Sequence, residues 1–441
     1  MSGAMSGASD EISLQICLAS GRSRAIRVPQ SCSVEGLKRE VERSFDLGLL
    51  DFKLISSSGR QVTGSLEALC DGESLTCLLS LPKVVATGYA FALLCSGWVV
   101  TWGDARYGGD GVRRMATEVH GSQHAFAALS EDGSVQLWGH LPRPPVDTTH
   151  LRRIYAADQA FAGLLSDGSV VSWGDPIWGG DSTAVRHQLQ DVEEIKVSRG
   201  AFAAVLKDRS IVTWGHPLWG GDSRAFQDQL RDVRQLESST AAFAALLGDG
   251  SVVSWGHRNW GGDSRSVRDR LRQVMQLESK EGGFLARLAD GSTVEWGVDH
   301  GVECQQIRST GSAFAGILKD GSVVAWGDPG LGGDCSAVRD QLRQVEEIHA
   351  SEGAFAAIRL DRSVVAWGHR LKGGDTRAVQ HQLVNVHQLV ASKAAFAAVL
   401  ADGSLVTWGD PAYGGCSDHV LELCKDVLLM RPGGEEAQGG A

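Results

Sequence analysis

The chain repeats one pattern of apolar and polar positions along most of its length. In the fifth unit, the apolar run Ala242 to Leu247 is followed by the turn Asp249-Gly250 and by a second run from Ser251 to Trp255. Two such runs joined by Asp-Gly predict a β-hairpin, because these residues accept the positive φ angles of a tight primed turn. Two other units have Asp208-Arg209 and Asp361-Arg362 at this position. Arginine disfavours positive φ, so the pattern predicts less comfortable turns there.

The hairpin recurs nine times, with a Phe in the first strand and a Trp-Gly pair closing the second. The nine Trp residues are Trp102, Trp138, Trp173, Trp214, Trp255, Trp296, Trp326, Trp367 and Trp408. Their commonest spacing is 41 residues, and the interval after the sixth is only 30. A period of this size indicates an array of one supersecondary unit.

Each unit also contains a third apolar segment upstream of its hairpin, such as Val192 to Val197 or Val345 to Ala350. Before that segment, Val185, Leu189 and Val192 keep the spacing of a helix face, which predicts a short helix leading into the strand. Both faces of the hairpin strand Ala242 to Leu247 are apolar. A strand buried on both faces needs a sheet on each side of it, so we expect three-stranded sheets stacked around a ring or along a rod.

The first eighty residues have a different pattern. Strand-like segments ISLQICL and RAIRV flank a turn at residues 20–22, and strands FKLIS and SLTCLLSL follow around a turn at residues 58–60. Between these pairs, Ser33 precedes a segment with Leu37 and Val41 on one face, which predicts a capped helix.

This order of hairpin, helix, strand, turn and final strand resembles ubiquitin, with residues 33–38 similar to that family's helix start and residues 59–62 similar to its tight turn. The chain continues through Pro82 without a Gly-Gly terminus, so the resemblance implies a built-in docking module and no conjugation. The alternative is a β-grasp fold that only packs against the repeats. Gly433-Gly434 near the end follows no ubiquitin-like pattern and is placed in a tail.

The repeats resemble those of the regulator of chromosome condensation family, also found in HERC-like ubiquitin ligases. Segment DGSVVSWGDPIWGGDS at residues 167–182 carries the resemblance through its Asp-Gly turn, Val-Val strand, Trp-Gly pair and Gly-Gly loop. The resemblance implies a β-propeller. The short units are closer to the three-stranded blades of β-lactamase inhibitory protein type II. We therefore expect a mainly β protein: a disordered start at residues 1–10, a ubiquitin-like β-grasp domain at residues 11–81, a propeller of seven to nine blades at residues 82–430 and a disordered tail at residues 431–441.

Residues Asp426 to Met430 match the start of a further unit. A propeller needs its last blade joined to its first, since open sheet edges are a liability. We predict that this segment pairs with the first unit between Val84 and Trp102 and closes the ring.

Composition narrows the function classes. The formal net charge is -11 and no Lys/Arg run stands out, which argues against nucleic acid and anionic membranes as partners. Nine scattered cysteines without a Cys-x-x-Cys pair indicate reduced thiols in an intracellular protein, cytoplasmic or nuclear. The start lacks the pattern of a signal peptide, and no apolar run is long enough to span a membrane.

The strongest candidate site is a ring of side chains that precede Gly-Gly in the loops. These are Tyr107, Trp178, Trp219, Trp260, Leu331 and Tyr413, with Lys372 at the same position. Aromatic side chains around a rim would anchor a protein partner. The alternative is that each ring covers its own helix.

Two further repeated positions have plainer explanations. The Asp after six of the seven Gly-Gly pairs is expected to cap the following helix, so we predict no metal site. The His or Asp after eight of the nine Trp-Gly pairs is expected to be a turn residue. No catalytic or cofactor-binding motif stands out, so we predict a protein that is not an enzyme and uses no cofactor.

The first hypothesis is a scaffold that binds a protein partner through the propeller and ubiquitin or proteasome machinery through the N-terminal domain. A second is a component of a HERC-like ligase system, whose catalytic region would have to lie elsewhere. A third is nucleotide exchange on a small GTPase, for which Leu141 to His150 is the candidate segment.

Overall fold

The structure is a computed structural model of all 441 residues. It describes residues 11–18, 22–45, 47, 50–63, 66, 69–111, 113–141, 150–280, 282–297, 304–417 and 420. The predicted terminal segments and the predicted closing strand at residues 426–430 lie outside these ranges.

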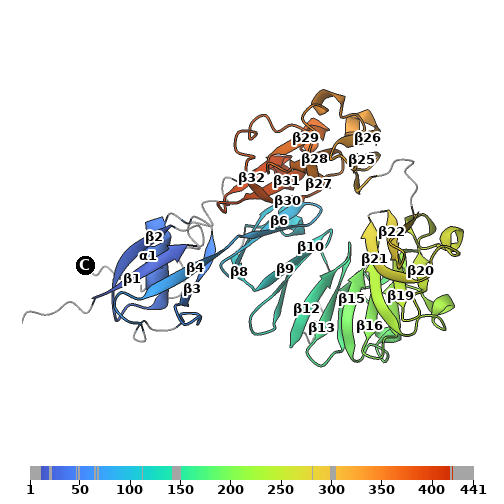
Figure 1. Ribbon diagram of the computed structural model, residues 1–441, viewed down its shortest axis with the longest axis horizontal. Coiled ribbons are helices and arrows are strands. Elements are labelled where there is room, and N and C mark those ends of the chain that lie inside the picture. Colours follow the sequence, from blue (N-terminus) through green and yellow to red (C-terminus); the bar gives the residue numbers. More distant parts are fainter. Residues whose placement is uncertain are drawn as a thin grey trace, which may run out of the picture.

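The N-terminal part forms one mixed sheet with a helix against it (Figure 1). Its elements are β1 (Glu11–Leu18), β2 (Ser23–Pro29), α1 (Val34–Phe45), β3 (Asp51–Ser56) and β4 (Ser74–Ser80). The strand order is β2-β1-β4-β3, with β1 and β4 parallel and the other neighbours antiparallel. Ser33 caps the helix by accepting the Gly36 N–H at 3.2 Å, and Leu37 and Val41 are fully buried. The predicted order of elements is therefore confirmed, whereas membership of the ubiquitin family stays a prediction.

Nine further antiparallel sheets follow, eight with the three strands that the repeat predicted and the first with four. Together they form a β-propeller, and the expectation of seven to nine blades resolves to nine in the described chain (Figure 1). The strands of the first five blades are β5 (Lys83–Ala86), β6 (Ala90–Cys95) and β7 (Trp98–Gly103); β9 (Glu118–Gly121), β10 (Ala125–Leu129) and β11 (Val135–Gly139); β12 (Leu151–Ala156), β13 (Ala160–Leu165) and β14 (Val170–Gly174); β15 (Val192–Val197), β16 (Ala201–Leu206) and β17 (Ile211–Gly215); β18 (Val233–Ser238), β19 (Ala242–Leu247) and β20 (Val252–Gly256).

The strands of the last four blades are β21 (Val274–Lys280), β22 (Gly283–Leu288) and β23 (Thr293–Gly297); β24 (Gln306–Ser309), β25 (Ala313–Ile317) and β26 (Val323–Gly327); β27 (Val345–Ala350), β28 (Ala354–Arg359) and β29 (Val364–Gly368); β30 (Val386–Ala391), β31 (Ala395–Leu400) and β32 (Leu405–Gly409). The first blade adds a fourth strand that the sequence pattern did not predict, β8 (Arg113–Met115), which pairs with β7.

Two details of the repeat differ from the expectation. The hairpin turn is a three-residue loop: the Gly250 N–H donates to Leu247 O at 3.0 Å, and only the glycine has positive φ, at 80°. This is a type I turn followed by a left-handed residue, so the prediction of a primed turn was wrong. The prediction of less comfortable turns at the two Asp-Arg positions is confirmed, since Arg209 and Arg362 have φ of 64° and 62°.

The predicted short helix is a single 3-10 turn. It is present as η3 (Thr183–Val185), η5 (Arg224–Phe226), η7 (Arg265–Val267) and η9 (Ser336–Val338). The chain then runs through further turns that bury one leucine, such as Leu189 at 0% exposure, before the next inner strand begins.

Adjacent blades are joined by small residues packing against aromatic ones. Ala242 and Ala244 on one face of β19 lie in a cluster with Phe284 and Trp296 of the next blade. On the opposite face, Phe243 packs against the preceding blade. Alternating side chains on one strand thus serve both neighbours. The small alanines let the sheets approach closely enough to bury the rings.

The Gly-Gly loops latch each blade to the next. A Cβ at Gly220 would lie 2.5 Å from a ring carbon of Phe243, and the Gly220 carbonyl accepts the indole N–H of Trp255 at 3.0 Å. A Cβ at Gly221 would lie 2.3 Å from the carbonyl oxygen of Gly215. The first glycine is therefore required by the next blade's aromatic ring and the second by the chain's own backbone.

The first strands of successive blades pack side by side, except for β21 and β24, between which residues 298–303 lie outside the described ranges. The first and ninth blades meet directly, because the Gln388 side chain accepts the Val84 N–H at 3.0 Å and donates to the Val84 carbonyl at 2.9 Å. The Lys393 N–H also donates to Gly88 O at 2.9 Å. These bonds join the last blade to the first.

Candidate partner-binding face

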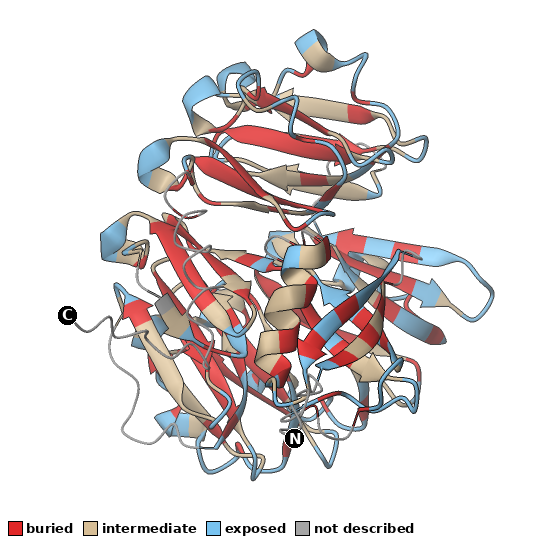
Figure 2. Cartoon of the chain, turned by 90° about the vertical axis from the view of Figure 1, so that its left-hand side faces the viewer, coloured by how far each residue is buried: buried red, intermediate tan, exposed pale blue. Residues whose placement is uncertain are grey.

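Seven short helices project from one side of the blades, one in each Gly-Gly loop, and are exposed (Figure 2). They are η1 (Ala105–Tyr107), η2 (Pro176–Trp178), η4 (Pro217–Trp219), η6 (Arg258–Trp260), η8 (Pro329–Leu331), η10 (Arg370–Lys372) and η11 (Pro411–Tyr413). Each ends at the residue that the sequence singled out. We call these seven last residues the crown: Tyr107, Trp178, Trp219, Trp260, Leu331, Lys372 and Tyr413.

The His or Asp after Trp-Gly starts each crown helix. Asp175 accepts the Ile177 N–H at 2.9 Å, and at the same position Nδ1 of His216 accepts the Leu218 N–H at 3.3 Å. At these two positions the side chain places one acceptor atom where the first turn has an unpaired N–H, whereas His257 and His369 start their helices without a side-chain cap bond. The interpretation as turn residues is confirmed at these positions.

The crown side chains are all half-buried, because they lie across a blade boundary. A Cβ at Gly200, in the next blade, would lie 2.5 Å from the ring of Trp178, and a Cβ at Gly353 would lie 3.0 Å from Leu331. Trp178 and Leu331 therefore lie against the next blade, and partner binding by the crown stays a prediction. Their inner edges support the neighbouring blade and the remainder faces solvent.

Two crown tryptophans, from the third and fourth blades, lie next to each other. Trp178 and Trp219 have ring centroids 5.6 Å apart, and the Arg199 guanidinium lies 5.2 Å from the Trp219 centroid. Asp158 accepts from that guanidinium at 2.7 Å. Asp158 and Arg199 lie in the turns that follow the first strands β12 and β15 of their blades. The packing of the blades therefore fixes both charges relative to the crown.

A second aromatic group lies where the ninth, first and second blades meet. Tyr89 stacks on Tyr107 at 4.1 Å and on Tyr413 at 5.5 Å, and its hydroxyl accepts from Lys393 at 2.9 Å. His124 lies 5.6 Å from the Tyr107 ring. Burial, followed by the charge of Lys393, lowers the pKa of His124. The group therefore presents uncharged aromatic rings beside one cation.

The most exposed apolar side chains of this face were not singled out from the sequence. Ile177, Leu218 and Leu371 are 64%, 66% and 67% exposed, and each precedes a crown residue. Their signal was an apolar residue next to Trp or Lys in a loop whose other residues are polar, Pro or Gly. Exposed aliphatic tips beside half-buried rings are suited to burial under another protein.

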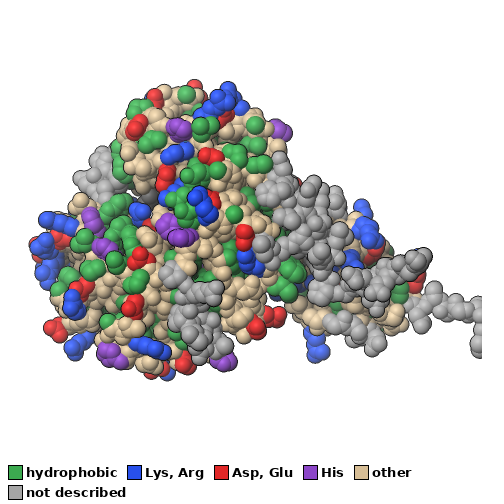
Figure 3. All heavy atoms as spheres, turned by 180° about the vertical axis from the view of Figure 1, so that it is seen from behind, with side chains coloured by type: hydrophobic (Ala, Val, Ile, Leu, Met, Phe, Trp, Pro, Cys, Tyr) green, Lys and Arg blue, Asp and Glu red, His purple; other side chains and the backbone are tan. Residues whose placement is uncertain are grey.

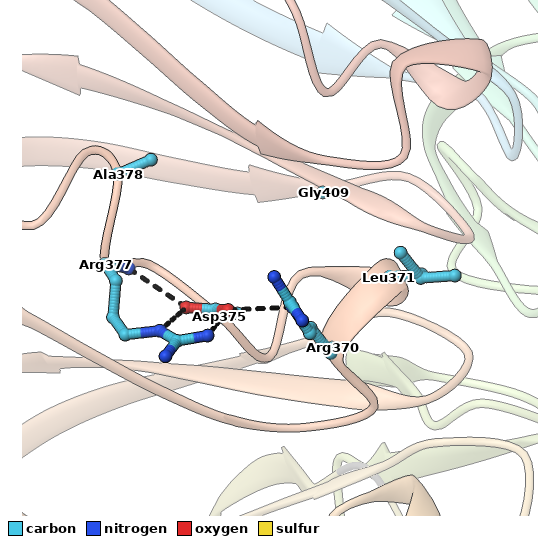
Figure 4. A pocket seen from close by; sticks show the side chains of 6 residues that line it. All are labelled: Arg370, Leu371, Asp375, Arg377, Ala378 and Gly409. Carbon is cyan, nitrogen blue, oxygen red and sulfur yellow. Dashed lines mark hydrogen bonds and ion pairs between the residues drawn. The ribbon is translucent and has the colours of Figure 1, made fainter.

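The Asp residues after Gly-Gly behave as structural groups. Asp375 accepts the Arg377 N–H at 3.1 Å and also pairs with the side chains of Arg377 and Arg370 (Figure 4). The bond from Arg377 holds the pKa of Asp375 well below its usual range. With Leu371 and Gly409, these residues line an open hollow of about 610 Å³. Within the described ranges, no three His, Cys, Asp or Glu side chains are grouped as metal ligands.

The face of the propeller seen in Figure 3 mixes both signs of charge with hydrophobic and histidine side chains. No helix among the described residues is long and apolar enough to cross a membrane. Of the segment Leu141 to His150, residues 142–149 lie outside the described ranges, so the structure adds nothing to the exchange-factor hypothesis.

Strand pairing and blade contacts define this part of the chain as a β-propeller of three-stranded blades. No family model and no curated protein matches the sequence. Among solved structures, Prp20p from Saccharomyces cerevisiae is 14% identical over 79% of this chain and 85% of that chain, with a TM-score of 0.34.

Two other solved structures have comparable values. The CRINKLY WD40 ectodomain of the receptor kinase ACR4 from Arabidopsis thaliana is 15% identical over 56% of this chain and 94% of that chain, with a TM-score of 0.33. The yeast RCC1 (Prp20) bound to Kap60 is 12% identical over 56% of this chain and 69% of that chain, with a TM-score of 0.32. Because these scores are low, the fold assignment rests on the strand pairing itself.

Proposed function

We propose that the chain is a non-enzymatic interaction scaffold whose crown face binds a protein partner. The observation that carries this proposal is the row of exposed aliphatic tips, Ile177, Leu218 and Leu371, beside half-buried crown side chains. Apolar and aromatic groups held on a rigid frame lose little entropy on binding, which favours a protein partner.

The test compares two sets of variants in the full chain. Ile177→Ser, Leu218→Ser and Leu371→Ser are combined in one variant, and Leu360→Ser is the control. Leu360 is 58% exposed but lies at a hairpin turn, at the opposite end of the blade from the crown. Proteins captured from a cell extract are quantified by mass spectrometry.

We expect the triple variant to lose a specific set of captured proteins that the control variant retains. Both variants are first compared with the natural chain for thermal midpoint, so that a folding defect is recognised. If the captured set is the same for all three proteins, the crown face is not the binding surface.

The second part of the proposal is that the N-terminal domain links the scaffold to ubiquitin or proteasome machinery. It is supported by the strand order β2-β1-β4-β3 and by two exposed leucines on the last strand, Leu78 and Leu79, which are 46% and 41% exposed. Binding of the full chain to ubiquitin-receptor domains and proteasome subunits is measured before and after Leu78→Ser. Lack of binding by the natural chain would remove this part and leave the crown proposal intact.

A further inference from the structure

Two crown loops carry an arginine on each side of the Gly-Gly pair. The fifth blade has Arg258 and Arg265, and the eighth blade has Arg370 and Arg377. At the position of Arg258 and Arg370, the other five loops have alanine or proline. In both arginine-bearing loops, the two guanidiniums meet at the Asp that follows Gly-Gly. We call this arrangement of two arginines on one aspartate the arginine fork.

The two forks have nearly the same geometry. In the eighth blade, Nη2 of Arg377 lies 2.6 Å from Asp375, and Nε of Arg370 lies 3.1 Å from it. In the fifth blade, the corresponding distances to the aspartate are 2.6 Å for Arg265 and 3.3 Å for Arg258. Since the same residues at the same positions give the same structure twice, the fork is determined by the sequence of the loop.

Each fork presents positive charge to solvent. The Arg370 and Arg377 side chains are 76% and 79% exposed, whereas the Asp375 side chain between them is 20% exposed. The hydrogen bonds from Arg377 hold the pKa of Asp375 well below its usual range, so this carboxylate is ionised at neutral pH. The fork therefore combines two positive charges with one negative charge, and the positive groups lie outermost.

The guanidiniums also have donors left for a second anion. One guanidinium has five N–H donors, and one carboxylate offers about four lone-pair sites. The two guanidiniums on Asp375 therefore carry more donors than that carboxylate can accept. A second carboxylate would carry the single negative charge that the fork lacks, and arginine binds carboxylates through parallel hydrogen bonds.

Only one crown loop combines a fork with an exposed aliphatic side chain. Leu371, which is 67% exposed, follows the first arginine of the eighth-blade fork. The fifth blade has Asn259 at this position. The third and fourth blades have the exposed side chains Ile177 and Leu218, but a proline replaces the first arginine there. Positive charge and exposed apolar surface therefore coincide at the eighth blade.

The eighth-blade fork and its aliphatic neighbour line one hollow (Figure 4). The two arginines lie on either side of Asp375, and Leu371 lies beyond Arg370. Ala378 and Gly409, at the end of β32 in the ninth blade, complete the lining. The hollow is open to solvent, so it suits a segment that lies along the surface of the crown.

We propose that this hollow binds an acidic peptide segment of a protein partner, which rests on the proposed function of the crown face. An Asp or Glu side chain of the partner binds the fork, and an adjacent apolar side chain packs on Leu371 and Ala378. A phosphorylated residue carries up to about two negative charges and is a poorer match, because Asp375 repels the excess charge.

The first test selects a random peptide library, displayed on phage, against the natural full chain. We expect the enriched peptides to contain Asp or Glu next to an aliphatic or aromatic residue. Enriched peptides without an excess of acidic residues, or a selection without enrichment, would overturn the proposal.

The second test compares Arg370→Pro with Arg258→Pro in the full chain. Each removes one exposed guanidinium from a fork, and proline is the residue of four other crown loops at this first helical position. An enriched peptide is titrated by fluorescence anisotropy. We expect about five-fold weaker binding to Arg370→Pro and unchanged binding to Arg258→Pro. Arg370→Gln, which keeps the backbone N–H, is expected to weaken binding to the same extent as Arg370→Pro.

Thermal midpoints of the variants are compared with that of the natural chain, so that a folding defect is recognised. Equal weakening by Arg370→Pro and Arg258→Pro would indicate general attraction to positive charge and would refute a site in the hollow. Unchanged binding by all variants would refute it as well.

Changes in the peptide test the carboxylate directly. Replacing its acidic residue by the corresponding amide is expected to weaken binding to the natural chain about five-fold and to leave binding to Arg370→Pro unchanged, because the two groups act as a pair. If the amide weakens binding to both proteins equally, the carboxylate does not bind the fork. Tighter binding of a phosphoserine peptide would overturn the choice of a carboxylate.

The two proposals for the crown fail in different ways. If Arg370→Pro leaves peptide binding unchanged while the triple serine variant of the crown loses its captured proteins, only the hollow is rejected. If Arg370→Pro weakens peptide binding while the triple variant retains all captured proteins, the hollow binds acidic peptides and the wider crown face is not the partner surface.

Discussion

The close packing of Gly220 against the next blade predicts how far one added methyl group lowers the free energy of unfolding. Gly220 has φ of 97°, and a Cβ there would lie 2.5 Å and 2.8 Å from two ring carbons of Phe243. Gly220→Ala therefore adds a left-handed alanine and a clash with a ring that is itself fully buried. Gly291→Ala is the matched control, since Gly291 has φ of 83° and no atom within 4 Å of the added carbon.

The two variants share the backbone cost and differ in the clash. A left-handed non-glycine residue costs about 1–2 kcal/mol. Overpacking a buried site adds about 1–3 kcal/mol. We therefore expect Gly291→Ala to lower the free energy of unfolding by about 1–2 kcal/mol and Gly220→Ala by about 2–5 kcal/mol.

A propeller of nine blades need not unfold in two states, so the free energies are best measured locally. Native-state hydrogen exchange of β19 and β20 reports the boundary latched by Gly220, and thermal midpoints give the rank order of the variants. If Gly220→Ala costs no more than Gly291→Ala, the loop does not act as a latch and the packing argument is wrong.

Three further predictions concern other parts of the ring. Arg209→Gly is expected to raise the free energy of unfolding by about 0.5–1 kcal/mol, because a strained φ of 64° is relieved and only an exposed ion pair with Asp232 is lost. Arg209→Ala keeps the strained φ and should raise neither the free energy of unfolding nor the thermal midpoint. Burial lowers the pKa of His124, so the unfolded chain binds its proton first as pH falls below about 6.5 and stability is lost from there downward. A smaller drop in thermal midpoint from pH 7 to pH 5 in His124→Gln checks this, and an unchanged profile would contradict it. Gln388→Ala removes both bonds to the Val84 backbone and is expected to cost about 1–3 kcal/mol, seen as faster exchange in β5; unchanged exchange would show that other contacts close the ring.

Much of the candidate site could be predicted because it depends on position within the repeat. The spacing to Gly-Gly selected the crown residues, and the structure places all seven at the ends of short helices on one side of the blades. The exposed tips Ile177, Leu218 and Leu371 were missed. Hydrophobic residues are usually interpreted as core, and only the three-dimensional arrangement shows that a three-residue helix points these side chains outward.

The amino-acid sequence by itself determined the unit: two apolar strands, a glycine-bearing turn and a third strand at a fixed distance, because strand alternation and turn geometry depend on neighbouring residues. The bounds of β15 and β27 are those that the pattern predicted. Only the tertiary structure decided how the units meet. Trp178 packs on the blade after its own, and Gln388 joins residues 304 positions apart in the chain. These relations depend on which face each blade offers to the next, and the sequence of a single unit does not show that.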